Sequence, residues 1–298
     1  MNNHSLILLL GGEGQLGLSL FQLAGKEHII LPKRTDVDLL YPERLANLVT
    51  RLRPTVVINA AAYTSVEHAE INPELAYKIN TKAVEALANA AKNIGALLVH
   101  FSTDYVFDGC GDKPWCESDK PAPLNVYGLS KWQGEQAIIA SGCRRLVLRT
   151  SWLHSPYRAN FLKTMLHLAP NHSSLQIVCD QVGAPTSARM LAEATFNAIS
   201  QTLTNPVLEG TYHVVASGYV SWYEYAKFIF QEALHIGMLN CTPSIFPVTS
   251  SNYESKVHRP LNSRLDTKLF SDTFGFDFSS WEAGVVETIR QLSINKST

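Results

Sequence analysis

The sequence of 298 residues has no large excess of charge of either sign. Its 25 lysines and arginines are balanced by 26 aspartates and glutamates, which gives a formal net charge of -1 at pH 7. A chain this close to neutrality has no net electrostatic attraction to nucleic acid or to a membrane surface. We therefore expect neither as a partner.

Long apolar runs and closely spaced cysteines are also missing. The apolar run near the start, Leu6 to Leu10, has about a quarter of the length that a membrane-spanning helix needs. It lacks the basic flank and cleavage site of a signal peptide. The five cysteines are scattered, odd in number and without CxxC spacing, so they indicate neither a disulfide framework nor a zinc site. We expect a cytoplasmic protein.

The first half of the chain alternates short apolar runs with longer amphipathic stretches. This alternation is typical of βαβ units and predicts an α/β fold with a Rossmann-type, doubly wound parallel sheet. A helix is expected from residue 73 to about Gly95. The predicted strands are Leu6–Leu10, His28–Leu31, Val56–Asn59, Leu97–Ser102 and Leu146–Thr150.

The pattern becomes looser after Trp152, with Pro-, Asn- and Ser-rich loops. Helices are expected near residues 160–168, 187–202 and 221–236. We predict that residues 1–152 form mainly a nucleotide-binding Rossmann domain and residues 153–298 mainly a smaller substrate-binding lobe. Some elements of the second part are expected to return to the first domain.

A glycine loop follows the first predicted strand. Gly11, Gly14 and Gly17 form a GxxGxxG pattern that opens a helix. Glycines at such a turn let backbone N–H groups approach a dinucleotide diphosphate at the positive end of the helix. The alternative is a glycine-rich turn without a ligand. Because Glu13 lies within the loop, its carboxylate must point outward if a diphosphate binds.

The end of the second predicted strand bears on the choice between NADPH and NADH. The segment Leu31-Pro32-Lys33-Arg34 lacks an acid for the adenosine ribose. Lys33 and Arg34 favour NADPH if they bind its 2′-phosphate, and the alternative is that they are solvated loop charges. Asp38 and Leu39 are expected at the adenine end.

The catalytic candidates are Tyr127 and Lys131, which are four residues apart and therefore lie on one face of a helix. A nearby lysine cation is expected to lower the tyrosine pKa, so that the phenol can donate a proton to a ketone while a nicotinamide donates hydride. The spacing alone is weak, because Tyr223 and Lys227 share it. We interpret that second pair as one face of another helix.

Other polar residues follow the predicted strands. Thr103 comes after a buried strand and is expected to bind the substrate oxygen or Tyr127, the alternative being a turn cap. The small residues from Asn59 to Thr64 would let the backbone run close to a cofactor, or would form a packed turn. Trp152 is expected to stack on a ligand or to belong to the core. His68, His100 and His154 are interpreted as structural or surface groups.

Seven segments between Gly11 and Leu265 form one combined pattern: GxxGQLG, NAAAYT, STDYVFDG, PLNVYGLSK, RTSWL, DQVGAPT and RPLNSRL. Together they resemble the dTDP-4-dehydrorhamnose reductase family of extended short-chain dehydrogenases/reductases. The resemblance implies NADPH- or NADH-dependent reduction of a dTDP-deoxysugar, dTDP-4-dehydro-L-rhamnose, and a homodimer.

The resemblance also implies roles for individual residues. Thr103, Tyr127 and Lys131 match the catalytic trio. The positions implied for the cofactor are Gly14, Gln15, Leu16, Asp38, Leu39, Ala62, Tyr63 and Thr64. The positions implied for the deoxysugar nucleotide are Val66, Asp104, Tyr105, Trp152, Asn262, Ser263 and Arg264.

Some family members carry a glutamate where Arg189 stands, linked to magnesium between subunits. Because a cation cannot ligate a cation, we expect no metal site here. Three alternatives remain: a reductase of another sugar nucleotide, an epimerase, and a non-catalytic protein like the regulatory subunit of methionine adenosyltransferase. An intact Thr103, Tyr127 and Lys131 argue against the last of these.

Overall fold

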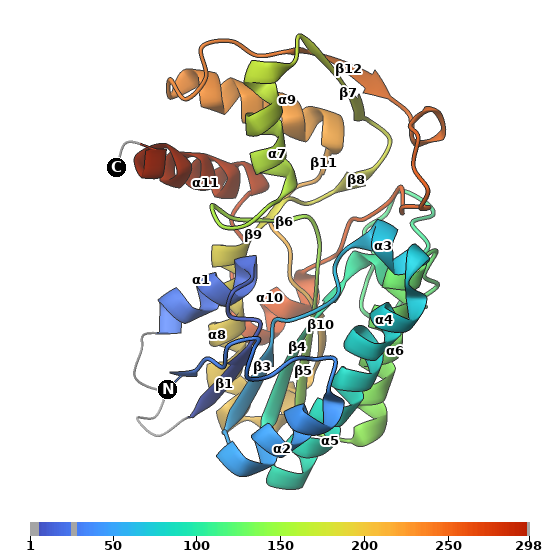
Figure 1. Cartoon of the computed structure of the whole chain (residues 1–298), viewed down its shortest axis with the longest axis vertical. Coiled ribbons are helices and arrows are strands. Elements are labelled where there is room, and N and C mark those ends of the chain that lie inside the picture. The colour runs from blue at the N-terminus through green and yellow to red at the C-terminus, as the bar shows by residue number, and fades with distance from the viewer. Residues whose placement is uncertain (1–5, 25–28, 297–298) are drawn as a thin grey trace.

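The computed structural model of the chain describes residues 6–24 and 29–296. It has two lobes, with a parallel six-stranded sheet in the lower lobe of Figure 1. The strand order is β2-β1-β3-β4-β5-β10. The strands are β1 (Ile7–Leu10), β2 (Ile29–Ile30), β3 (Val56–Asn59), β4 (Leu97–Thr103), β5 (Arg145–Thr150) and β10 (Gly210–His213).

The predicted Rossmann-type α/β fold is confirmed, and all five predicted strands are present. The expected start of the second strand, His28, lies outside the described residues. The sixth strand, β10, was not predicted. It pairs with β5, so part of the second half of the chain extends the sheet. The division near residue 152 remains a prediction.

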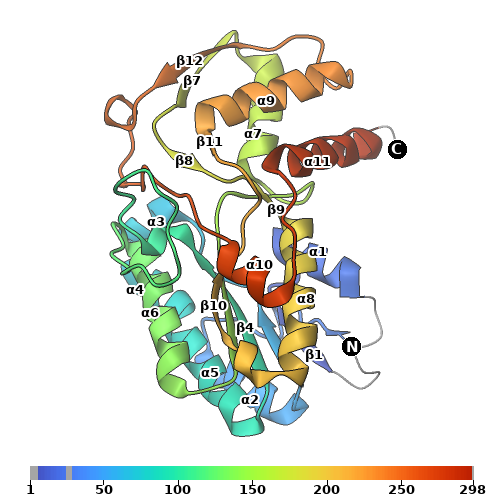
Figure 2. The ribbon, with the colours of Figure 1, turned by 180° about the vertical axis from the view of Figure 1, so that it is seen from behind.

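The sheet is covered on both faces because alternate residues of its strands point to opposite sides. Ile7 and Leu9 pack with α1, α8 and α10, whereas Leu8 and Leu10 pack with α2, α5 and α6. Figure 2 shows α8 and α10 on the face that Figure 1 hides. The helices are α1 (Gln15–Ala24), α2 (Pro42–Leu52), α5 (Ala83–Ile94), α6 (Val126–Ser141), α8 (Ala188–Thr204) and α10 (Lys268–Phe274).

The helix predicted from residue 73 to Gly95 is continuous but contains an irregular turn. α4 (Pro73–Tyr77) leads through a π-helical turn, Lys78–Lys82, into α5. Gly95 ends it in the left-handed conformation, with φ 71°. The π turn brings Asn80 to the site described below.

The second lobe has its own apolar core, built from three helices that Figure 1 shows above the sheet. These are α7 (Phe161–Leu168), α9 (Trp222–His235) and α11 (Trp281–Lys296). Short strand pairs complete it: β7 (Ser174–Val178) with β12 (Ser244–Val248), β8 (Val182–Gly183) with β11 (Val220–Ser221), and β6 (Leu153–His154) with β9 (Thr186–Ser187). Within the described residues, no helix combines the length and apolar character needed to cross a bilayer.

Candidate active site

A cleft of about 880 Å³ lies beyond the carboxyl ends of β1, β3 and β4. The strand order reverses between β1 and β3, which is where open α/β sheets bind ligands. The predicted cofactor residues that line this cleft are Gly11, Gly14, Gln15, Leu16, Arg34, Asp38, Leu39, Ala62, Tyr63 and Thr64. The predicted catalytic and substrate residues that line it are Val66, Thr103, Asp104, Tyr105, Tyr127, Lys131 and Trp152.

Five predicted site residues do not line the cleft, and one of them is Ser263, which is buried. Gly17 instead packs against the loop, since a Cβ there would lie 2.1 Å from the Gly11 carbonyl oxygen. Lys33 is exposed. Asn262 is buried and donates to the Lys113 carbonyl at 2.8 Å, and Arg264 donates to the Asn262 side chain at 3.0 Å. These last two residues therefore hold a neighbouring loop rather than face the cleft.

The glycine loop has the shape that a diphosphate requires. Gly11 adopts φ 78°, and a Cβ there would lie 2.6 Å from the Ala61 nitrogen. The Glu13 side chain lines the cleft, is 66% exposed, and has its carboxylate 4.0 Å from Arg158. Arg158, from the loop after β6, donates from Nε to the Glu13 carbonyl at 2.7 Å.

The segment after β3 is held by the π turn. Asn80 accepts from the Tyr63 N–H at 2.9 Å and donates to the Tyr63 carbonyl at 3.0 Å. It also donates to the Ser130 hydroxyl at 3.0 Å. π turns often occur at functional sites, and this one fixes the cleft wall relative to α6.

Replacing Asn80 with alanine should loosen this wall. Asn80 is buried, so its loss leaves the Tyr63 backbone groups unpaired, at a cost of about 1–3 kcal/mol. We expect the free energy of unfolding to fall by that amount and the Kd for NADPH to rise several-fold, as measured by urea denaturation and fluorescence titration. Asn93→Ala, at an exposed position on α5, is the control. Equal effects of the two substitutions would contradict this role.

Thr103 and Tyr127 meet at the cleft floor. Both residues line the cleft, where the Thr103 hydroxyl donates to Asp104 at 3.0 Å and accepts from the Tyr105 N–H at 3.1 Å. α6 approaches this turn closely because residue 128 is glycine; a Cβ there would lie 2.2 Å from the Tyr105 carbonyl oxygen. The predicted pairing of Thr103 with Tyr127 remains a prediction.

The expected lowering of the Tyr127 pKa is wrong for this structure. Burial raises the pKa of Tyr127 to about 12, and the effect of Thr103 opposes the rise only in part. Lys131 Nζ donates to the Phe101 carbonyl at 2.6 Å and contacts His100 Nε2 at 3.2 Å. Burial lowers the pKa of Lys131 to about 8. At neutral pH both the phenol and the ammonium therefore keep their protons.

Three residues that line the cleft have a buried side-chain oxygen without a hydrogen-bond partner among the described residues: Ser102 Oγ, Asp104 Oδ2 and Thr150 Oγ1. A buried polar atom without a partner is costly, and its presence in a cleft points to a polar ligand. Burial raises the pKa of Asp104 to about 6. The residues present thus fit a polyhydroxylated nucleotide ligand.

Trp152 reaches the cleft in a left-handed backbone conformation, with φ 47°. Its ring is stacked on Trp222 with centroids 3.5 Å apart. One face of the indole is therefore already covered by protein, and its binding of substrate remains a prediction. The second pair, Tyr223 and Lys227, lies on α9, where Lys227 is 3.7 Å from Glu224.

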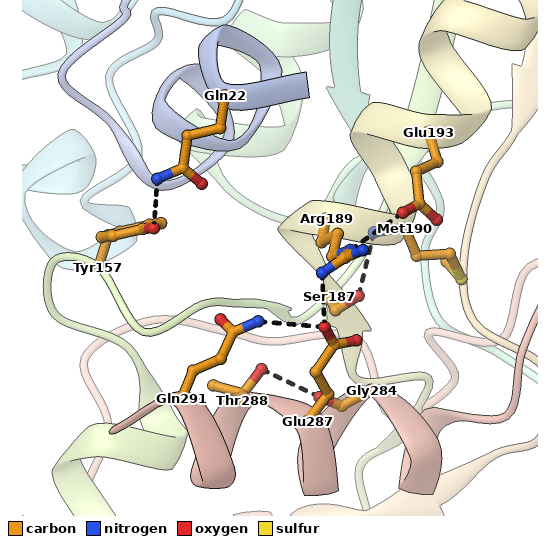
Figure 3. Close-up of polar contacts among 10 residues, drawn as sticks. All are labelled: Gln22, Tyr157, Ser187, Arg189, Met190, Glu193, Gly284, Glu287, Thr288 and Gln291. Atoms are coloured by element: carbon orange, nitrogen blue, oxygen red, sulfur yellow. Dashed lines mark hydrogen bonds and ion pairs between the residues drawn. The ribbon is translucent and has the colours of Figure 1, made fainter. Parts of the chain in front are cut away.

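Arg189 lies apart from this cleft, between two carboxylates (Figure 3). Its Nε is 3.0 Å from Glu193 and its Nη1 is 2.8 Å from Glu287. In the part of the chain that the structure describes, no group of three or more His, Cys, Asp or Glu residues is placed to hold a metal ion. The expectation of no metal remains a prediction.

Sequence reasoning missed several residues of the site. Asn80, Arg158 and Trp222 were not considered, and His100 was interpreted as structural although it contacts Lys131. The π turn and the Arg158 loop carry no local sequence pattern. The only sequence signal for Arg158 was Glu13, because an acidic residue in a diphosphate-binding loop predicts a cation nearby to offset its charge.

A doubly wound parallel sheet, a glycine loop at its switch point and a Tyr-x-x-x-Lys helix beside a strand-end threonine define an oxidoreductase of the short-chain dehydrogenase/reductase type. A family model described as "RmlD substrate binding domain" matches residues 5–294. The chain belongs to this family, that of the dTDP-4-dehydrorhamnose reductases.

Individual relatives agree along nearly the whole chain. The dTDP-4-dehydrorhamnose reductase of Escherichia coli K12 is 43% identical over 291 residues, covering 96% of this chain and 97% of that enzyme. The Bacillus anthracis reductase, solved in complex with NADP, is 33% identical with a TM-score of 0.87, and the match covers 96% of this chain and 99% of that one. A Clostridium acetobutylicum structure is 35% identical with a TM-score of 0.89, covering 96% and 99%.

Proposed function

We propose that this protein reduces the C4 ketone of dTDP-4-dehydro-L-rhamnose (dTDP-6-deoxy-L-lyxo-4-hexulose) to dTDP-L-rhamnose, with NADPH or NADH as reductant. The product serves the synthesis of cell-surface polysaccharide such as O-antigen. The observation that carries the proposal is that Thr103, Tyr127 and Lys131 line one cleft with three residues that have unpartnered buried oxygens, in a chain of this family.

Different parts of the cleft have different roles in the proposed reaction. The glycine loop and the Tyr63 segment hold the dinucleotide, which when bound supplies the hydride. Thr103 and Tyr127 bind the ketone oxygen, and Tyr127 donates its proton to that oxygen as negative charge develops there. Lys131, one helical turn away on α6, stabilises the resulting phenolate. Val66, Asp104, Tyr105 and Trp152 orient the deoxysugar nucleotide.

The proposal includes a cytoplasmic location and a homodimer. The cysteines are free, which agrees with a reducing compartment. Neither nucleic acid nor a membrane is needed as a partner.

The test is oxidation of NADPH and NADH by the purified protein with enzymatically generated dTDP-4-dehydro-L-rhamnose. Rapid oxidation that yields dTDP-L-rhamnose is the expected result. An epimerase would instead retain its cofactor through purification, which absorbance of the pure protein would show. Binding of cofactor without turnover of any sugar nucleotide would favour a regulatory protein and contradict the proposal.

Cofactor preference should depend on Arg34. This residue lines the cleft and lies 3.6 Å from Asp38, but its side chain is 76% exposed. Solvent screening makes such contacts weak, so we expect Arg34→Ala to raise the KM for NADPH by roughly three- to tenfold. The KM for NADH should stay unchanged, because NADH lacks the 2′-phosphate. A similar change in KM for both cofactors would show that Arg34 does not bind the 2′-phosphate.

A further inference from the structure

Few positively charged side chains line the cleft and could bind a diphosphate. Among the described residues that line it, only Arg34, Lys131 and Arg158 carry a positive side chain. Lys131 is buried and donates a hydrogen bond to the Phe101 carbonyl, and Arg34 lies beside Asp38 after β2. Arg158 is the one that contacts the glycine loop, through the Glu13 carbonyl.

The loop that carries Arg158 is hydrogen-bonded to the residue that follows the glycine loop turn, Gln15. Ser155 and Asn160 both donate to the Gln15 side chain, at 3.0 and 2.8 Å. Gln15 is the first residue of α1, so these bonds connect the second lobe to the end of the helix where a diphosphate binds. The position of Arg158 is therefore set by hydrogen bonds on both sides of it.

The backbone of Arg158 is strained. Its φ is 55°, a left-handed conformation that residues with a Cβ adopt uncommonly. Such strain tends to persist at ligand-binding sites, where the surrounding structure enforces it. Among the described residues, the guanidinium donates a hydrogen bond through its Nε–H alone. The Arg158 side chain is 59% exposed, and one of its two Nη groups lies 4.0 Å from the Glu13 carboxylate.

We propose that Arg158 binds the cofactor diphosphate, and that Glu13 is the counter-charge that holds the guanidinium near the loop until the diphosphate replaces it. This inference rests on the proposed use of NADPH or NADH. A planar guanidinium with free Nη donors suits phosphate oxygens. The arrangement also explains how an acidic residue is tolerated in a diphosphate loop, because Arg158 offsets its charge.

The experiment measures the Kd of NADPH and of NADH for the wild-type protein, Arg158→Gly and Arg53→Gly. Arg53 is the matched control, since it is an exposed arginine with φ 47° at the end of α2 and lies outside the cleft. Both glycine substitutions relieve a left-handed backbone, so neither should lower Tm. Arg158→Gln serves as a second variant that keeps a Cβ.

We expect Arg158→Gly and Arg158→Gln to raise both Kd values by a similar factor, roughly five- to tenfold, because both cofactors share the diphosphate. Arg53→Gly should change neither value. Glu13→Gln should lower both, since it removes the competing carboxylate. Unchanged Kd values in both Arg158 variants, or a loss confined to NADPH, would overturn the inference alone. A wild-type protein that bound neither cofactor would overturn the proposed function as well.

Discussion

Replacing Tyr127 with phenylalanine should lower kcat by about 10²–10⁴-fold, the usual contribution of general acid catalysis. The phenol is the group placed to donate a proton, because it lines the cleft and burial keeps its pKa near 12. Phenylalanine keeps the ring and its edge contact with Tyr105, whose centroid is 5.7 Å away. We therefore expect the Kd for NADPH to stay within about twofold of wild type. Steady-state kinetics and fluorescence titration measure the two quantities.

The chain provides a matched control for this experiment. Tyr223 also precedes a lysine by four residues, but it lies on α9 and does not line the cleft. Tyr223→Phe should leave kcat unchanged. Unchanged turnover in Tyr127→Phe, or an equal loss in both variants, would remove Tyr127 from the role of proton donor.

The second large effect concerns stability. Glu135 lies on α6 one turn beyond Lys131 and forms a two-point ion pair with Arg149 of β5, at 2.7 and 3.0 Å. Both side chains are buried, with 0% and 4% exposure. Removing one partner of a buried pair leaves an uncompensated charge and costs about 3–5 kcal/mol. We expect Glu135→Ala to lower the free energy of unfolding by this amount, as measured by urea denaturation.

Two further variants make that prediction specific. The double variant Glu135→Leu with Arg149→Met should recover most of the lost stability, because apolar residues of similar volume can replace a buried pair. Glu85→Ala breaks the exposed pair with Lys82 and should cost less than about 1 kcal/mol. A cost for Glu135→Ala as small as that for Glu85→Ala would show that the pair does not anchor α6.

Local sequence patterns were sufficient to predict five of the six strands of the sheet and much of the cleft. Strands such as Val56–Asn59 are continuous apolar runs, as expected for strands buried on both faces. Gly11 and Thr103 each follow or end a predicted strand, so the doubly wound topology brings them to one edge of the sheet, and Tyr127, in the first turn of α6, lines the same cleft.

The features that were not predicted depend on contacts between distant segments. β10 has four residues, of which Gly210 and Thr211 are only partly buried, and its assignment comes from pairing with β5. The role of Asn80 arises from a π turn that places it against Tyr63. The pKa of Tyr127 is set by the depth of its burial, which the spacing to Lys131 does not reveal.

Hydride transfer to the sugar is the central claim, and isotope labelling tests it most directly. The wild-type protein would be incubated with dTDP-4-dehydro-L-rhamnose and NADPH carrying deuterium at the transferring position of the nicotinamide. The account predicts dTDP-L-rhamnose with one deuterium, located at C4 of the sugar. Absence of that product while cofactor is bound, or a product without deuterium at C4, would contradict it.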